Sequence, residues 1–160
     1  MSQVRQLLEP IYDENSRILI LGTFPSVESR EAQFYYANSR NRFWKVIAGI
    51  FECGDYNNVE EKKVMLLNNR IALWDVIESC EITGSSDSSI KNVIAADLSI
   101  ILDNCNIDQI YSNGDKAFKL YMKYTYPITK REIIKLPSTS TANAKFSLDK
   151  LIDYWNCIKQ

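Results

Sequence analysis

Hydrophobic positions along the chain form short continuous runs, separated by longer segments in which apolar residues recur at helical spacing. The runs are too short for helices and are typical of buried strands, at residues 17–21, 71–76, 109–112 and 132–136. The helical spacing predicts helices at 41–51, 58–69, 95–104, 113–124 and 147–158, with a helical turn at 29–34 and a short opening helix at 4–8. Residues 125–130 and the polar, serine-rich segment 79–89 are predicted as loops, the latter as a mobile segment.

Strands that alternate with helices predict a parallel sheet with right-handed crossovers and helices on both faces. The expected fold class is therefore α/β, a three-layer α/β/α sandwich around a short four-stranded parallel sheet. No repeat, low-complexity tract or linker interrupts the pattern, and 160 residues are enough to bury a core. We expect a single domain over residues 1–160.

Two polar loops follow directly after the first and the last predicted strand. The first reads GTFPS (22–26) and the second reads PSTSTANAK (137–145). Because ligands bind beyond the carboxyl ends of parallel strands, we expect both loops to border one cleft. Between them in the chain lies QFYYANSRNRFW (33–44), where large rings stand beside asparagines and arginines. A plain connecting loop does not need that combination, so this stretch is a candidate site.

Composition limits what such a site can be. The net charge of −1 argues against binding nucleic acid or membranes through overall charge, although it permits a local basic face. The chain shows neither a signal peptide nor an apolar run that would span a bilayer, so we expect a cytoplasmic protein, nuclear in a eukaryotic host, without a membrane partner. There is no histidine, and Cys53, Cys80, Cys105 and Cys157 lie far apart, which predicts buried free thiols and no metal site.

Three strings together resemble the uracil-DNA glycosylase superfamily: G-x-x-P-[GS] after the first strand, YYANSRNRFW some way beyond it, and LPSTSTANA after the last strand. Within that superfamily the chain is most similar to the hypoxanthine-DNA (deoxyinosine) glycosylases, and more distantly to mismatch-specific uracil and thymine glycosylases. The resemblance implies a monomeric, monofunctional DNA repair enzyme. Such an enzyme flips a deaminated base, hypoxanthine or as a second candidate uracil, out of DNA and hydrolyses its N-glycosidic bond without a metal or cofactor.

The resemblance also implies roles for single residues. Tyr36 would stack on the flipped base, with Tyr35 as its competitor. In relatives, an acidic or amide side chain in the first loop holds the water, and Phe24 occupies that position in this chain. A phenylalanine cannot hold water, so the resemblance assigns the catalytic role to Asn41, with Asn38 as a weaker candidate. An amide cannot deprotonate water at neutral pH, but it can orient water or hydrogen-bond the leaving base. Asn41 can equally serve as a helix N-cap.

The remaining roles concern pocket walls and DNA contacts. The resemblance places Thr23, Phe24, Pro25 and Ser26 in the pocket or against the damaged strand. Leu136 stands where relatives often have a base-donating histidine, so main-chain amides of the last loop, helped by Ser138 and Ser140, are the candidate donors. Asn143 and Ala144 would lie near the gap left by the base. The candidate DNA-backbone contacts are Arg40, Arg42, Lys45 and Lys145.

Each of these residues also has a plainer interpretation, since a serine- and threonine-rich loop can simply cap a helix and a surface arginine is usually solvated. A second function therefore stays open. Because Phe24 and Leu136 are apolar, the chain can be a catalytically weak or inactive relative that binds nucleic acid or a nucleotide. A serine hydrolase is excluded, because the chain lacks histidine and a G-x-S-x-G motif.

Overall fold

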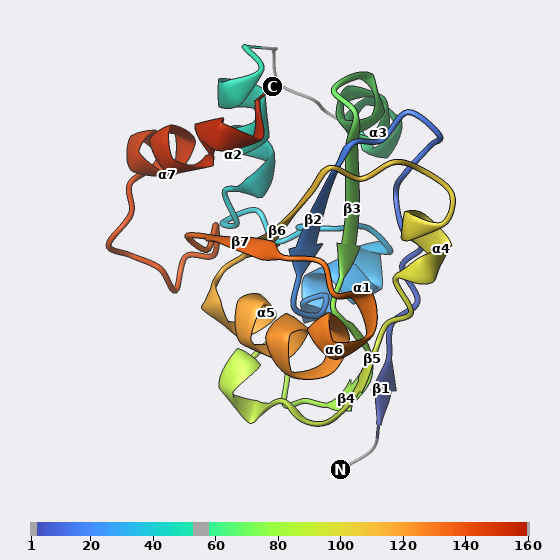
Figure 1. Cartoon of the computed structure of the whole chain (residues 1–160). Coiled ribbons are helices and arrows are strands. Elements are labelled where there is room, and N and C mark those ends of the chain that lie inside the picture. Colours follow the sequence, from blue (N-terminus) through green and yellow to red (C-terminus); the bar gives the residue numbers. More distant parts are fainter. Residues whose placement is uncertain (1–2, 53–57, 160) are drawn as a thin grey trace.

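A four-stranded parallel sheet runs through the centre of the computed structural model, which describes residues 3–52 and 58–159. The strand order is β3-β2-β6-β7 (Figure 1). The strands are β2 (Ile18–Gly22), β3 (Ile71–Asp75), β6 (Gln109–Asn113) and β7 (Ile133–Leu136). All four predicted strands are present within a residue or two of their predicted ends, and the predicted parallel arrangement is confirmed.

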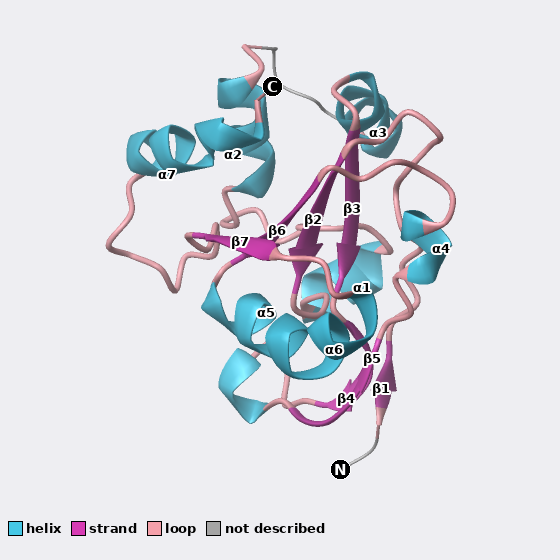
Figure 2. Ribbon diagram, in the orientation of Figure 1, coloured by secondary structure: helices cyan, strands magenta, loops and turns pink. Residues whose placement is uncertain are grey.

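Helices flank this sheet (Figure 2). The described α-helices are α1 (Val27–Ala32), α2 (Phe43–Ile50), α3 (Val59–Asn68), α4 (Ser99–Leu102), α5 (Asp115–Leu120), α6 (Tyr126–Thr129) and α7 (Leu148–Trp155). Shorter turns are the 3₁₀ turns η1 (Asp87–Ser89) and η3 (Asn156–Ile158) and the π-helical turn η2 (Tyr121–Thr125). α2 packs against α7, α3 against β3, and α5 against β6 and β7. None of the described helices is both long and apolar enough to cross a membrane.

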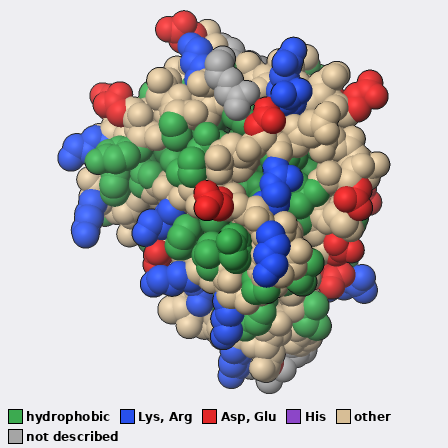
Figure 3. Space-filling view, viewed as in Figure 1, with side chains coloured by type: hydrophobic (Ala, Val, Ile, Leu, Met, Phe, Trp, Pro, Cys, Tyr) green, Lys and Arg blue, Asp and Glu red, His purple; other side chains and the backbone are tan. Residues whose placement is uncertain are grey.

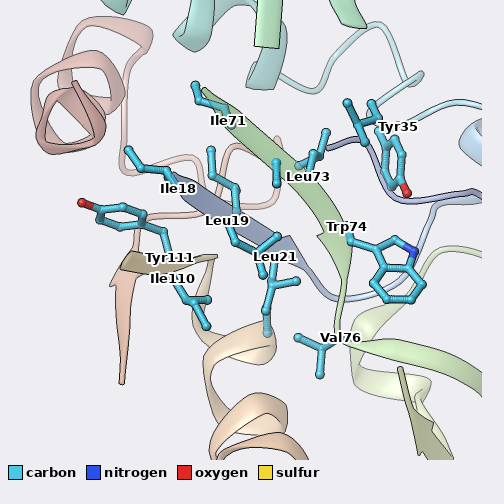
Figure 4. Packing of buried hydrophobic residues seen from close by; sticks show 14 of the residues in the cluster. Ile18, Leu19, Leu21, Tyr35, Ile71, Leu73, Trp74, Val76, Ile110 and Tyr111 are labelled. Carbon is cyan, nitrogen blue, oxygen red and sulfur yellow. The ribbon is translucent and has the colours of Figure 1, made fainter. Parts of the chain in front are cut away.

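The core forms on both sides of β2 and its neighbour β3. Every residue of β2 and β3 is buried, which is expected for parallel strands with both faces covered (Figure 4). A second part of the core joins α2 to α7, where the fully buried rings of Phe43 and Trp155 meet edge to face with centroids 5.9 Å apart. The central sheet is therefore a rigid base from which the strand-end loops project.

A second, antiparallel sheet was not predicted. It has the order β1-β4-β5 and consists of β1 (Val4–Arg5), β4 (Ile77–Glu81) and β5 (Lys91–Ala95). The predicted helix at 4–8 is wrong, because Gln6 donates its backbone N–H to the Glu78 carbonyl instead of forming a helical turn. The predicted loop at 79–89 is wrong as well, since it contains most of β4 and all of η1. These strands are short and polar, and register shifts between β4 and β5 break the alternation that would reveal them.

Other boundaries differ from prediction for local reasons. Residues 125–130 are not a loop but contain α6, with Pro127 in the first turn, where proline is tolerated. The predicted helix 95–104 is reduced to α4, because Ala95 still belongs to β5 and Asp97 accepts a hydrogen bond from the Ser99 N–H at the helix start. The predicted helix 113–124 ends at Leu120 and continues as η2.

The cysteine prediction is confirmed in part. Cys80 and Cys105 are buried free thiols, as expected. Cys157 is free but exposed, because it lies in η3 after the amphipathic part of the last helix has ended. Cys53 lies outside the described residues.

Candidate active site

A cavity of about 170 Å³ opens at the carboxyl ends of β2, β3 and β6. The strand-end residues Gly22, Asp75 and Asn113 line it, and the side chains of Asp75 and Asn113 are almost fully buried there. The arrowheads of β2 and β3 point to this same end, beside α1 (Figure 1). The walls come from both predicted loops and from the aromatic stretch between them: Thr23, Phe24, Pro25, Ser26, Ser29, Tyr35, Tyr36, Asn38, Asn41, Ser138, Thr139, Ser140 and Thr141. The prediction that both loops border one cleft is therefore confirmed.

One side of the rim comes from a segment that the sequence did not indicate. Ser85 and Asp87, at the start of η1, line the cavity. The segment is attached to α1, because the Val27 N–H donates to Ser85 Oγ at 2.9 Å and the Arg30 guanidinium donates to the Gly84 carbonyl at 2.8 Å. The segment thus forms one wall of the site, tied to α1 by these two hydrogen bonds.

Tyr36 occupies an unusual backbone conformation at the cavity. Its φ is 51°, a region that bulky side chains rarely adopt and that is common at functional sites. The ring stacks on Phe43 with centroids 4.1 Å apart and an interplanar angle of 18°. Tyr35 is different, because its ring is buried and its hydroxyl donates to the Glu9 carbonyl at 2.6 Å. Of the two tyrosines, Tyr36 is the one whose hydroxyl belongs to the cavity network.

A chain of hydrogen bonds joins the two loops across the cavity. The Asn113 amide donates to the Tyr36 hydroxyl oxygen at 3.1 Å and to Thr139 Oγ1 at 3.0 Å. Its oxygen accepts the Thr139 N–H at 3.0 Å, so both ends of the amide are occupied. Thr139 is fully buried, and its hydroxyl in turn donates to Asn41 Oδ1 at 2.8 Å.

The orientation of the Asn41 amide is fixed by two donors. Its Oδ1 accepts from Thr139 and also from the Phe43 N–H at 3.0 Å. A backbone N–H can only donate, so the atom facing it is the carbonyl oxygen, and the amide nitrogen is left without an acceptor among the described residues. Arg42 holds the formal N-cap position of α2, but Asn41 makes the side-chain hydrogen bond that caps the helix start. Asn38 also lines the cavity, and its Oδ1 accepts the Arg40 N–H at 2.9 Å.

Asp75 is the ionisable group at the bottom of the cavity. Its side chain is 4 % exposed, and its Oδ2 accepts a hydrogen bond of 2.7 Å from Gln6. Burial raises the pKa of Asp75 to about 7; the bond from Gln6 acts in the opposite direction, and the charge of Asp87 adds to the rise. Oδ1 accepts no hydrogen bond from a described residue and lies beside Gly22, where an added Cβ would be 2.5 Å from it.

Arg42 holds the last loop in place. Its guanidinium donates to the carbonyls of Ser140 at 3.0 Å, Asn143 at 3.3 Å, Thr139 at 3.4 Å, and Phe146. These bonds engage the guanidinium inside the protein, which differs from the prediction that Arg42 contacts the DNA backbone. Asn143 is not in the cavity wall either, because its amide donates to the Ser138 carbonyl at 3.1 Å and helps to form the loop.

The other predicted residues fall into two groups. Ser138 and Ser140 line the cavity, where each hydroxyl also accepts a local backbone N–H, from Ser140 and from Ala142 respectively. Arg40, Lys45 and Lys145 are exposed, which leaves them available for phosphate. Lysine and arginine side chains are also spread among hydrophobic groups over the face that carries α5 and α6 (Figure 3). Among the described residues, no group of three or more His, Cys, Asp or Glu side chains is placed to hold a metal ion.

Comparisons with known proteins agree with this geometry. The sequence profile of the Uracil DNA glycosylase superfamily matches residues 9–159. The chain belongs to this superfamily. It is 36 % identical over 145 residues to a hypoxanthine DNA glycosylase of Methanosarcina acetivorans, covering 88 % of this chain and 89 % of the relative. It is 33 % identical over 115 residues to one of Methanosarcina barkeri, covering 71 % of this chain and 73 % of the relative.

A solved structure supports the same assignment. The solution structure of a protein of Methanosarcina acetivorans, provisionally described as a uracil DNA glycosylase, superposes with a TM-score of 0.77 at 31 % sequence identity. The match covers 98 % of this chain and 99 % of that protein. Membership in the superfamily and the expected fold are therefore confirmed.

Asp75, Asn113 and Thr139 are cavity residues that sequence reasoning missed, in addition to Ser85 and Asp87 on the rim. Asp75 is the fifth residue of the apolar run IALWDV (71–76), and Asn113 was interpreted as the start of a helix. The available signal was the position of each residue at the carboxyl end of a buried strand. A charged or amide group there must either be paired or face a ligand.

Proposed function

We propose that this protein is a monomeric, monofunctional DNA repair glycosylase that hydrolyses the N-glycosidic bond of deaminated bases in DNA, hypoxanthine first and uracil second. Support comes from superfamily membership and from the two relatives that are named hypoxanthine DNA glycosylase. A cavity of about 170 Å³ is suited to one unpaired base and not to a base pair, which favours a base that leaves the stack before reaction.

In this proposal the flipped base lies against Tyr36. The ring is backed by Phe43 at 4.1 Å, so it forms a rigid stacking surface. Stacking and hydrogen bonds to the base edge offset the cost of unstacking, which is a few kcal/mol. The strained φ of Tyr36 fits a ring that is held in one position for a ligand.

The observation that carries the proposal is the fixed amide of Asn41. Both hydrogen bonds to its oxygen come from the protein, so only the amide nitrogen remains to act in the cavity. A nitrogen donor stabilises negative charge, and the departing base is the group that becomes negative as the glycosidic bond breaks. We therefore assign Asn41 to the leaving base, and Asn38 to the neighbouring wall, where its remaining amide donors can assist.

The last loop completes the site. Arg42 fixes its carbonyls, while Ser138 and Ser140 face the cavity as further donors to the base or to phosphate. The exposed Arg40, Lys45 and Lys145 supply local positive charge against the DNA backbone.

A strand-nicking assay with Asn41→Ala tests this proposal. Duplex oligonucleotides that carry one deoxyinosine or one deoxyuridine are incubated with enzyme in EDTA and then treated with alkali. We expect cleavage only after alkali, faster for deoxyinosine, and a loss of about 100-fold or more in Asn41→Ala with DNA binding retained. The matched control is Asn58→Ala, which removes an equivalent helix-capping amide from the start of α3, where Asn58 Oδ1 accepts the Glu61 N–H at 2.9 Å.

The same assay distinguishes the second candidate function. Phe24 and Leu136 are buried and apolar at two positions where the superfamily resemblance implies acid or base groups, which favours a catalytically weak binding module. Measurable binding of both oligonucleotides, with no alkali-dependent cleavage by the wild-type protein, would establish that function instead. Equal loss of activity in Asn41→Ala and Asn58→Ala would show that Asn41 acts only through helix stability.

A further inference from the structure

The amides assigned to the leaving base do not supply a group that can activate the attacking water. The side-chain oxygen of Asn41 accepts two hydrogen bonds from the protein, and that of Asn38 accepts one. Neither amide can take a proton from water at neutral pH. Phe24 is apolar at the position where the resemblance implies a water-holding group. A carboxylate can do both tasks, because it accepts a hydrogen bond from water and can also take up its proton.

Two carboxylates line the cavity, and they lie at different depths. Asp75 is almost fully buried at the end of β3, and Gln6 occupies one of its oxygens. Asp87 belongs to the exposed turn η1 on the rim. A base that enters a cavity from its mouth remains attached to a sugar at that mouth, so the N-glycosidic bond lies near the rim. Of the two carboxylates, Asp87 is therefore the one on the sugar side of the base.

The carboxylate of Asp87 is available to a ligand or to water. No described residue donates a hydrogen bond to it, and the polar groups of the same turn bond to one another instead. The hydroxyls of Ser86 and Ser88 lie 3.0 Å apart, and the Ser89 hydroxyl donates to the Ser86 carbonyl at 2.6 Å. Burial nevertheless raises the pKa of Asp87, while the charge of Lys116 on α5 acts in the opposite direction. A partly desolvated carboxylate beside a cavity is stabilised when water or a ligand supplies a donor.

We propose that Asp87 is a catalytic residue that holds the attacking water and takes up its proton. This inference rests on the proposed function and extends it to the nucleophile. The Arg30 guanidinium donates to the Gly84 carbonyl at 2.8 Å and so holds the segment that carries Asp87 against α1. A carboxylate held at the rim also stabilises the positive charge that develops on the sugar, as carboxylates do in glycoside hydrolysis.

The step balances without a further reactant. The bond between C1′ and the base nitrogen breaks, and its electron pair leaves with the base. The water oxygen forms the new bond to C1′, and the proton that this water loses passes to Asp87 and then to solvent. The departing base takes up one proton from solvent, so free base and an abasic sugar are the products.

Catalysis by this carboxylate depends on pH, because only the ionised form takes up a proton. Excision should therefore rise with pH as Asp87 ionises. Lys116→Met removes the charge that lowers the pKa of Asp87, so it should move this rise to higher pH, and Lys116→Arg should restore the wild-type position. The charge of Asp87 also reaches Asp75, whose pKa burial raises to about 7, and the buried groups of Tyr36 and Cys80, whose raised pKa values keep them neutral. The Lys116→Met shift should be absent in Asp87→Asn, which separates Asp87 from Asp75.

Azide rescue tests the role in the water step. Azide attacks carbon as an anion and needs no base, so it can replace water where the base is missing. Excision of deoxyinosine from a duplex is measured in single turnovers at saturating enzyme, with and without sodium azide. The variants are Asp87→Ala and the isosteric Asp87→Asn. The controls are Ser88→Ala, in the same turn but outside the cavity wall, and Asp153→Ala, which removes an exposed charge from α7.

We expect both Asp87 variants to excise deoxyinosine about 100- to 1000-fold more slowly than wild type, the range for loss of a general base. Azide should restore much of the rate of Asp87→Ala and yield a sugar with azide at C1′, while it leaves wild type unchanged. Binding by fluorescence anisotropy should be equal or tighter, because a negative charge leaves the rim. Ser88→Ala and Asp153→Ala should match wild type, and thermal unfolding should be the same in all variants.

Three results would overturn the inference, and they are distinguishable. Equal excision by Asp87→Ala and Ser88→Ala would leave the glycosylase function standing and refute the role of Asp87. A slow Asp87→Ala that azide does not accelerate, with the pH profile of wild type, would show that Asp87 acts only through the structure of its turn. No excision by wild type would refute the proposed function, and the role of Asp87 would fall with it.

Discussion

Gly22 and Asp75 lie opposite each other at the carboxyl ends of β2 and β3, and no Cβ fits between them. A Cβ on Gly22 would stand 2.5 Å from Asp75 Oδ1 and 2.8 Å from the Tyr36 hydroxyl oxygen. The two functional groups thus approach the backbone at a point that only glycine leaves open. The parallel pairing of two buried strands therefore sets the depth and shape of the cavity.

Substitution of Gly22 should damage the site more than the fold. In Gly22→Ala the carboxylate and the phenol must both shift, and we expect excision of deoxyinosine to fall by about 100-fold or more, since small displacements of positioned groups have effects of that size. The free energy of unfolding should fall by about 1–3 kcal/mol. Gly49→Ala is the matched control, because its Cβ would lie 2.6 Å from Ile152 Cδ1, the flexible end of a side chain remote from the cavity. Similar losses of activity in the two variants would contradict this account.

The stability of the protein should fall as pH rises because of Asp75. Folding raises its pKa from an ordinary 3.8 to about 7, so between these values the native state keeps a proton that the unfolded chain releases. The stabilisation is complete below pH 4, declines through pH 7, and amounts to about 4 kcal/mol at most. The chain has no histidine, so few other groups titrate in this window.

Urea unfolding at pH 5 and pH 8 measures this effect directly. From pH 5 to pH 8 the free energy of unfolding should fall more in wild type than in Asp75→Asn, which carries no ionisable group at this position. Asp87, whose pKa is also raised by burial, contributes in the same direction in both proteins. Identical changes in the two proteins would show that Asp75 ionises normally in the folded state.

Two neighbouring arginines should behave differently. Arg42→Ala removes the hydrogen bonds to the carbonyls of the last loop, so we expect a loss of about 3 kcal/mol and faster amide hydrogen exchange over residues 137–146. Arg40→Ala should change stability by less than about 0.5 kcal/mol, because the side chain is exposed. If Arg40 contacts phosphate, its removal weakens DNA binding and lowers the slope of log affinity against log salt concentration by about 1. Normal loop protection in Arg42→Ala would refute the structural role of Arg42.

The adjacent tyrosines provide another contrast. Tyr36→Leu removes the stacking surface, and we expect binding of a duplex with a flipped base to weaken by about 1–3 kcal/mol, the range seen for base–aromatic stacking. Tyr36→Phe keeps the ring and should retain most of that affinity. Tyr35→Phe removes only the hydroxyl that donates to the Glu9 carbonyl, so it should affect unfolding and leave binding unchanged. A stronger effect on binding from Tyr35→Phe than from Tyr36→Leu would exchange their roles.

The sequence was sufficient for the central sheet and for the two loops at its edge, because buried parallel strands appear as short apolar runs and a turn signal follows each. It was not sufficient for β1, β4 and β5, which are short, polar and irregular in register. Nor did it indicate the connection between the loops, since hydrogen bonds such as Thr139 to Asn41 join residues that lie 98 positions apart. Asp75 was missed because its burial and its partner Gln6, 69 positions away, exist only in the folded chain.

Hydrolysis of the N-glycosidic bond is tested by identifying the products of a single turnover on a deoxyinosine duplex in H₂¹⁸O with EDTA present. We expect free hypoxanthine, an abasic sugar that carries ¹⁸O at C1′, and a strand that breaks only after alkali. Asn41→Ala should give the same products much more slowly. A strand break with hypoxanthine still attached, or a covalent enzyme–DNA adduct trapped by borohydride, would contradict hydrolysis of the N-glycosidic bond.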